Sequence, residues 1–243
     1  MARPVRCIAV LAAMSSELQP LRRILGIPRS RWDGEKFSRG AYKGVTVLTA
    51  VTKMGLAAAQ QTAEELFSTY GTAIDHLFVV GIAGANDLSL DIGQVVIPAA
   101  VVDARDGVLR YPENLCAGEP SGVIYSSDQL CYDSAFVAML HSRNVALVDM
   151  ESGAIAAVCD RHGCPFTIVR AVSDKVDEHA QSFDVFHLAN ADGSPRYLAA
   201  IRYVLGNPRR IGYLLTMARG AKKAIAASTE QLTRNIDALL SRA

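Results

Sequence analysis

The sequence lacks any hydrophobic run long enough to cross a bilayer. A membrane helix needs about 20 consecutive apolar residues, and the first apolar run, residues 7–14, is much shorter. It follows Arg3 and Arg6 but leads directly into a helix-like segment, which is typical of a first buried strand and not of a secretory signal. The sequence therefore predicts a soluble protein, and we expect a cytoplasmic location.

Paired cysteines are missing as well. The cysteines are odd in number, scattered and without a CxxC motif: Cys7, Cys116, Cys131, Cys159 and Cys164. This usage is typical of reduced, intracellular chains. Cys159, His162 and Cys164 lie close together, but no second cluster completes a tetrahedral zinc site. We therefore predict neither a metal nor an organic cofactor.

Phosphate-binding glycine loops and an excess of charge are also absent. The chain contains neither GxGxxG nor a Walker loop, which argues against dinucleotide and nucleoside-triphosphate chemistry. Its formal charge of +1 gives no reason to expect a nucleic-acid partner. Half of the 243 residues are apolar, and no Pro/Gly/Ser-rich linker divides the chain. We expect one domain over residues 1–243, with a helical C-terminal extension from about residue 190.

What the chain does contain is an alternation of strand-like and helix-like segments. It predicts an α/β protein, a three-layer α/β/α sandwich with a central mixed sheet. Residues 103–129 carry turn formers and little periodicity, and predict loops. Strands are predicted at 5–12, 37–42, 45–51, 76–81, 94–98, 145–149 and 166–173, and helices at 15–25, 56–70, 151–161, 195–205 and 209–240.

Two of the apolar strands stop abruptly near acidic residues. One is followed by Glu151 and the other by Asp174. Ligands of open α/β sheets bind just outside the carboxyl ends of strands, so we expect both acids on one rim of the sheet. The alternative for each acid alone is a helix-start or turn residue.

The same rim is expected to hold Glu17 and a glycine segment. Glu17 follows the first strand, and Gly81-Ile-Ala-Gly84 ends another, where small residues let the backbone approach a ligand. A solvated first-turn acid and a plain tight turn are the alternatives. Acids gathered at one rim in this way mark the place on an α/β sheet where chemistry usually happens.

These segments together resemble a known family. Ala13-Met-Ser-Ser-Glu17, Gly81-Ile-Ala-Gly84, Val148-Asp-Met-Glu-Ser-Gly-Ala-Ile-Ala156 and Val169-Arg-Ala-Val-Ser-Asp174 resemble the purine nucleoside phosphorylase and nucleosidase superfamily. The most similar branch is the 5′-methylthioadenosine/S-adenosylhomocysteine nucleosidases. The resemblance runs in order over residues 5–186 and includes Ser182-Phe-Asp184.

The resemblance implies a role for individual residues. Asp174 matches the acid that protonates N7 of the purine, Ser173 the residue that orients it, and Glu17 the residue that holds the attacking water. Glu151 matches the carboxylate that binds the ribose hydroxyls. The remaining substrate-binding positions are Met150 against the sugar, Met14 and Phe183 around the 5′ substituent, Leu130 and Cys131 at the adenine, and Ile82, Ala83 and Gly84 in the glycine segment.

Hydrolysis is favoured over phosphorolysis. The phosphorylases of the superfamily that this chain resembles bind phosphate with arginines after the first strand and after the glycine segment. Here those places hold Glu17 and Ala-Asn-Asp-Leu, and the negative charge of Glu17 disfavours phosphate. Arg22, Arg23 and Lys53 remain as alternative phosphate ligands. A nucleoside-binding protein without catalysis is a third hypothesis, but binding alone does not require three acids.

The tail and one substitution leave the substrate open. Ile82 replaces the small polar residue usual in the nucleosidase branch, and the two predicted C-terminal helices are more than that branch has. Such a tail resembles the branch that removes adenine from adenosylhopane. Its basic amphipathic character also allows weak membrane-surface contact through the C-terminal helix, with packing on the core as the alternative. The resemblance implies a homodimer.

Overall fold

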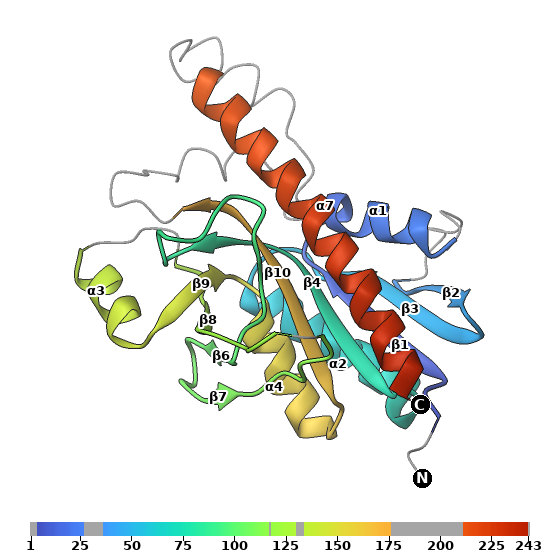
Figure 1. Cartoon of the computed structure of the whole chain (residues 1–243). Coiled ribbons are helices and arrows are strands. Elements are labelled where there is room, and N and C mark those ends of the chain that lie inside the picture. The colour runs from blue at the N-terminus through green and yellow to red at the C-terminus, as the bar shows by residue number, and fades with distance from the viewer. Residues whose placement is uncertain (1–3, 27–35, 117, 130–133, 176–210, 243) are drawn as a thin grey trace.

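The computed structural model in Figure 1 describes residues 4–26, 36–116, 118–129, 134–175 and 211–242. Ten strands in the described residues form one mixed sheet. The strands are β1 (Cys7–Ala12), β2 (Ser38–Tyr42), β3 (Val45–Val51), β4 (His76–Ala85), β5 (Val95–Val96), β6 (Ala100–Asp103), β7 (Leu109–Arg110), β8 (Val123–Ser126), β9 (Val145–Asp149) and β10 (Phe166–Lys175). The helices are α1 (Ser15–Ile24), α2 (Leu56–Tyr70), α3 (Ser134–Ser142), α4 (Ser152–His162) and α7 (Ile211–Arg242), with a 3-10 turn η1 (Gly71–Ala73).

Helices cover both faces of the sheet. On one face α2 and α4 pack together, and their buried side chains join those of β1 and β4 in the larger core cluster. On the other face α1 and α7 cover the alternate residues of β1 and β4, through Leu18, Leu21, Leu232 and Ile236. Figure 1 shows α7 lying across β4 and β10. The predicted α/β/α sandwich with a mixed sheet is confirmed.

One strand, β4, organises the functional end of the sheet. Along one edge it pairs with β1 up to Val79 and with β9 from Gly84 onward. Its other edge pairs with β10 from Leu77 to Ala85, with one bulge in β10 at Ser173. Because β1 pairs only as far as Val79 and β9 only from Gly84, residues 80–83 of β4 have no strand partner on the first edge within the described sheet. This interval, the β4 gap, is where the C-terminal ends of β1 and β9 meet.

The second half of α7 belongs to the core, as the ordinary reading of its apolar stripe predicts. Leu232, Ile236 and Leu239 are buried, whereas Leu215 in the first half is exposed. At Gly220 the helix α7 lies very close to β10, since a Cβ there would lie 2.6 Å from the Ser173 carbonyl oxygen. Membrane contact through this helix stays a prediction.

Several predicted elements differ from the structure. The predicted loop region 103–129 contains β8, which pairs in parallel with β6 and β9, and the short β7. The helix α3 and the strand β6 were not predicted. The predicted helix at 195–205 lies outside the described residues. None of the described helices is long and apolar enough to span a membrane.

Candidate active site

Glu17 lies in the β4 gap. It stands in the first turn of α1, directly after β1, and is 2% exposed. Its carboxylate accepts hydrogen bonds from the backbone N–H of Ile82 (2.9 Å) and from that of Met14 (2.8 Å). Burial raises the pKa of Glu17, although Arg170 and these N–H donors oppose the shift. Glu17 is therefore not the solvated helix-start acid that was its alternative, because it closes an unpaired edge of the sheet.

Arg170 crosses from the neighbouring strand to the same place. It is paired in register with Gly81, and its guanidinium is fully buried. A Cβ on Gly81 would overlap both the guanidinium and the Glu17 carboxylate, so only glycine leaves room for this crossing. The guanidinium contacts Asp149 Oδ2 at 2.8 Å and Glu151 Oε2 at 3.2 Å. Burial disfavours its charge, but these carboxylates outweigh that effect and raise the pKa of Arg170.

Glu151 approaches the β4 gap from the end of β9. One of its oxygens is held by Arg170, and the other accepts the backbone N–H of Gly55 at 3.2 Å. Burial, together with the negative charges of Asp149 and Glu17, raises the pKa of Glu151 to about 7 in spite of Arg170. A carboxylate in this state changes charge near neutral pH, which is characteristic of functional acids.

Asp149 supports both Glu151 and Arg170. Besides its ion pair with Arg170, it accepts a hydrogen bond from the Ser126 hydroxyl, which in turn accepts the Gly153 N–H at 2.7 Å. The first N–H groups of α4 also point toward Asp149. Negative charge is favourable at a helix N-terminus. The arrangement fixes the chain direction just before Glu151.

Ser173 and Asp174 lie at the end of β10, where the ladder to β4 is irregular. Val172 pairs with Ala83 and Asp174 with Gly84, so Ser173 is an extra residue in a bulge. The Ser173 hydroxyl contacts both the Asp174 carboxylate and the Ala83 carbonyl oxygen, the latter at 3.2 Å. Asp174 itself is partly exposed and lies at the edge of the β4 gap, in register with Gly84.

The other predicted site residues divide into two groups. Met14 and Met150 are partly exposed and lie close to Glu17 and Glu151 in the chain. Ile82, Ala83 and Gly84 are consecutive residues of β4, with Ile82 bonded to Glu17 and Gly84 in register with Asp174. Leu130, Cys131 and Phe183 lie outside the described residues. The structure thus brings Glu17 and Glu151 together around one guanidinium, and places Asp174 beside the same strand.

Sequence reasoning assigned no role to Arg170 or Asp149. A signal was available, because a lone arginine inside a buried apolar strand requires an acidic partner. The sequence could not say which of its 24 acidic residues that partner was. The need for glycine at position 81 was likewise invisible, since it follows from two side chains that arrive from other strands.

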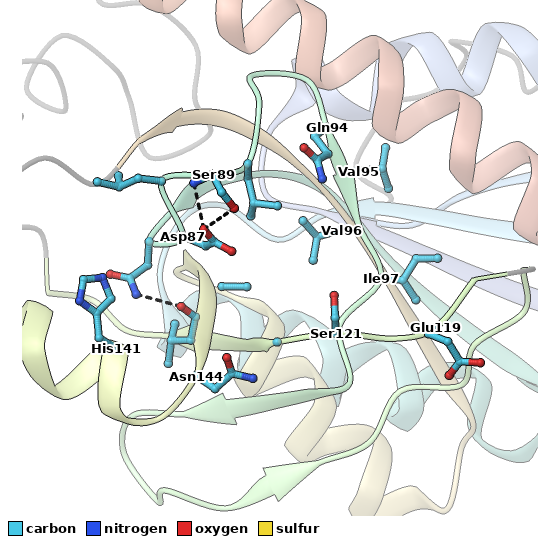
Figure 2. Close-up of a pocket in the computed structure, with 16 residues that line it drawn as sticks. Asp87, Ser89, Gln94, Val95, Val96, Ile97, Glu119, Ser121, His141 and Asn144 are labelled. Atoms are coloured by element: carbon cyan, nitrogen blue, oxygen red, sulfur yellow. Dashed lines mark hydrogen bonds between the residues drawn. The ribbon is translucent and has the colours of Figure 1, made fainter.

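A separate cavity of about 630 Å³ lies behind the end of β4 (Figure 2). Asp87, Ser89, Glu119, His141 and Asn144 line it together with Val95, Val96 and Ile97. Asp87 accepts hydrogen bonds from the Ser89 backbone and hydroxyl. None of the predicted catalytic or substrate-binding residues lines this cavity. The part of the chain that is described also shows no group of three or more His, Cys, Asp or Glu residues that could hold a metal ion.

The amino-acid sequence is similar to those of known proteins. A model of the phosphorylase superfamily matches residues 7–120 and 119–201, and the chain belongs to that superfamily. An aminodeoxyfutalosine nucleosidase of Helicobacter pylori is 26% identical over 228 residues, covering 81% of this chain and 98% of the relative. A 5′-methylthioadenosine/S-adenosylhomocysteine nucleosidase of Chromohalobacter salexigens is 28% identical over 214 residues, covering 75% and 90%.

Solved structures show the same fold. A futalosine hydrolase of Helicobacter pylori superposes with a TM-score of 0.72 at 19% identity, over 96% of this chain and 98% of that one. A 5′-methylthioadenosine/S-adenosylhomocysteine nucleosidase of Neisseria meningitidis, in complex with methylthio-immucillin-A, superposes with a TM-score of 0.68 at 22% identity, over 98% and 99%.

Proposed function

We propose that this protein is a nucleosidase that hydrolyses the N-glycosidic bond of a 5′-modified adenosine and releases adenine. The observation that carries the proposal is the convergence of two buried carboxylates, Glu17 and Glu151, around Arg170 at the β4 gap, beside the Ser173–Asp174 pair. The nucleosidase names of the curated relatives support the same chemistry.

Each acid has a distinct task in this proposal. Asp174 donates a proton to N7 of the base, so that adenine departs as a neutral molecule. Glu151 binds the ribose hydroxyls, and its negative charge stabilises the cationic sugar that develops as the bond breaks. Glu17 takes a proton from the water that attacks C1′. Burial raises the pKa of Glu17, which makes its carboxylate a stronger base.

Arg170 makes this arrangement compatible with burial. The buried carboxylates of Glu17, Asp149 and Glu151 repel one another. The Arg170 guanidinium lies among them, and its positive charge offsets that repulsion. Because Arg170 is engaged by Asp149 and Glu151, it does not offer a vacant anion site. This charge balance supports water over phosphate as the nucleophile.

The function is tested by following adenine release. The purified protein is incubated with 5′-methylthioadenosine and with S-adenosylhomocysteine, with and without phosphate. We expect release of adenine that is independent of phosphate and is lowered at least 100-fold, in line with the loss of general-acid catalysis, by Asp174→Asn. The control Asp91→Asn changes an exposed loop acid and retains activity. Phosphate-dependent formation of a sugar phosphate, or no release from either nucleoside, contradicts the proposal.

We also propose a cytoplasmic homodimer. The described cysteines, Cys7, Cys116, Cys159 and Cys164, are free thiols, which supports a reducing compartment. Val108, Leu109 and Tyr111 are exposed together on one segment, with Tyr111 71% exposed, and an apolar cluster of this kind supports a subunit interface. Light scattering of the purified protein measures the mass, and a monomer at micromolar concentration contradicts the dimer.

A further inference from the structure

Lys53 has a backbone conformation that its residue type does not favour. Its φ is +67°, in the left-handed region where a side chain costs free energy. The other non-glycine residues with positive φ in the described chain are Lys43, in the tight β2–β3 hairpin, and Asn144, whose residue type tolerates this conformation. Lys53 follows a strand in a longer loop, where glycine would satisfy the backbone equally well. A lysine at this position carries a conformational cost that glycine would not carry, which makes its side chain a candidate for a function.

The loop that carries Lys53 borders the candidate active site. On one side the Thr52 N–H donates to the Ala12 carbonyl at 2.8 Å, next to Met14. On the other side the Gly55 N–H donates to Glu151 at 3.2 Å. The Thr52 hydroxyl also donates to the Lys53 carbonyl at 2.8 Å. The backbone is therefore held by the site on both sides of Lys53, whose own side chain is exposed.

The charges at the site leave Lys53 as the available cation. Glu17, Asp149 and Glu151 are carboxylates, and the Arg170 guanidinium is engaged by them. The ammonium of Lys53 has no hydrogen bond or ion pair with any described residue. Lys175, the other lysine that follows a strand at this rim, donates to the Leu88 carbonyl at 2.6 Å. An anionic group on a substrate would be repelled by the acids unless Lys53 offsets their charge.

Strand order indicates which end of a substrate Lys53 meets. Across the rim the order is β3, β1, β4 and β10, so Lys53 after β3 and Asp174 on β10 lie at opposite ends. A purine at Asp174 and a ribose at Glu151 leave the 5′ substituent to extend toward β1 and β3. We propose that Lys53 forms an anion-binding subsite for a carboxylate on the 5′ substituent. The subsite rests on the proposed nucleosidase function and makes the enzyme selective for acidic over neutral 5′ groups.

A matched pair of substrates tests the subsite. These are 5′-deoxy-5′-(2-carboxyethylthio)adenosine and its neutral carboxamide, which have nearly the same size. We expect Lys53→Met to lower kcat/KM for the carboxylate about tenfold, the effect of losing one charge-assisted hydrogen bond, and to leave the amide within about twofold. Lys53→Arg retains the preference. Lys43→Met removes the other left-handed lysine, on the hairpin, and leaves the ratio of the two substrates unchanged.

Lys53→Gly separates conformation from charge. Glycine relieves the backbone, so the urea midpoint rises, while the preference for the carboxylate is lost as in Lys53→Met. Equal effects of Lys53→Met on both substrates, or no effect on either, overturn the subsite even if adenine is released. No release of adenine from either substrate by the wild-type enzyme instead refutes the nucleosidase function itself. A phosphate-dependent rate that Lys53→Met abolishes assigns the ammonium to free phosphate and also overturns the subsite.

Discussion

The ionisation of Glu151 makes a quantitative prediction about stability. Its pKa is raised from 4.5 to about 7, chiefly by burial. Between these values the folded protein holds a proton that the unfolded chain has released, so the free energy of unfolding falls as the pH rises from about 4.5 to 7. The shift corresponds to about 3 kcal/mol, at 1.36 kcal/mol for each pKa unit. Glu151 is therefore a group whose ionisation weakens the fold.

Urea unfolding at pH 5 and pH 8 measures this effect in wild type and in Glu151→Gln. The informative quantity is the difference between the two proteins, because Glu17 and His76 also titrate abnormally but are common to both. We expect the advantage of wild type over Glu151→Gln to shrink by about 3 kcal/mol between pH 5 and pH 8. Glu119→Gln, a change at an exposed loop glutamate far from the site in the fold, is the control and retains the wild-type dependence. The same pH dependence in wild type and Glu151→Gln would refute the reasoning.

Three glycines give further predictions. Gly81→Ala forces apart the guanidinium and Glu17, so we expect a loss of about 1–3 kcal/mol in urea unfolding and of most adenine release; full activity would show that the crossing is not required. Gly220→Ala meets the Ser173 carbonyl at 2.6 Å and is expected to lower both stability and kcat. Gly212→Ala, in the same helix with open space around it, is expected to stabilise the protein by about 0.5–1 kcal/mol. If both helix variants raised, or both lowered, the free energy of unfolding, the predicted clash between residue 220 and Ser173 would be contradicted.

Local patterns were sufficient for most of the described fold. Runs of apolar residues and helix periodicity located the strands and helices around the site with ends within a few residues, although β4 continues to Ala85, beyond its predicted end at residue 81. The prediction was wrong for β8, which is short and follows Pro120 and Gly122. This strand is held by parallel neighbours on both sides, β6 and β9, and such non-local pairing leaves little trace in a four-residue segment.

The candidate site was only partly predictable. Strand ends indicated that Glu17 and Asp174 share a rim, because β1 and β10 both run parallel to β4. Glu151 reaches the same place for a different reason, since β9 runs antiparallel to β4 and its C-terminal end stops at the β4 gap. The clamp formed by Arg170 depends on the register of β10 against β4, which puts the arginine opposite Gly81. Register is set by the packing of the whole sheet, so the identity of the central cation could not be read from either segment alone.

The β4 gap joins folding and chemistry in a single set of contacts. Within it the Ile82 N–H donates a hydrogen bond to Glu17. The Ile82 carbonyl oxygen accepts one from Arg170, and the Ala83 carbonyl oxygen accepts one from Ser173. Side chains thus complete a ladder that the neighbouring strands leave open. A lineage that abandoned the reaction would not be free to discard these residues, because their removal would strand polar backbone in a dry interior. An inactive descendant would keep much of the catalytic sequence, and motif matches alone would fail to expose its loss of activity.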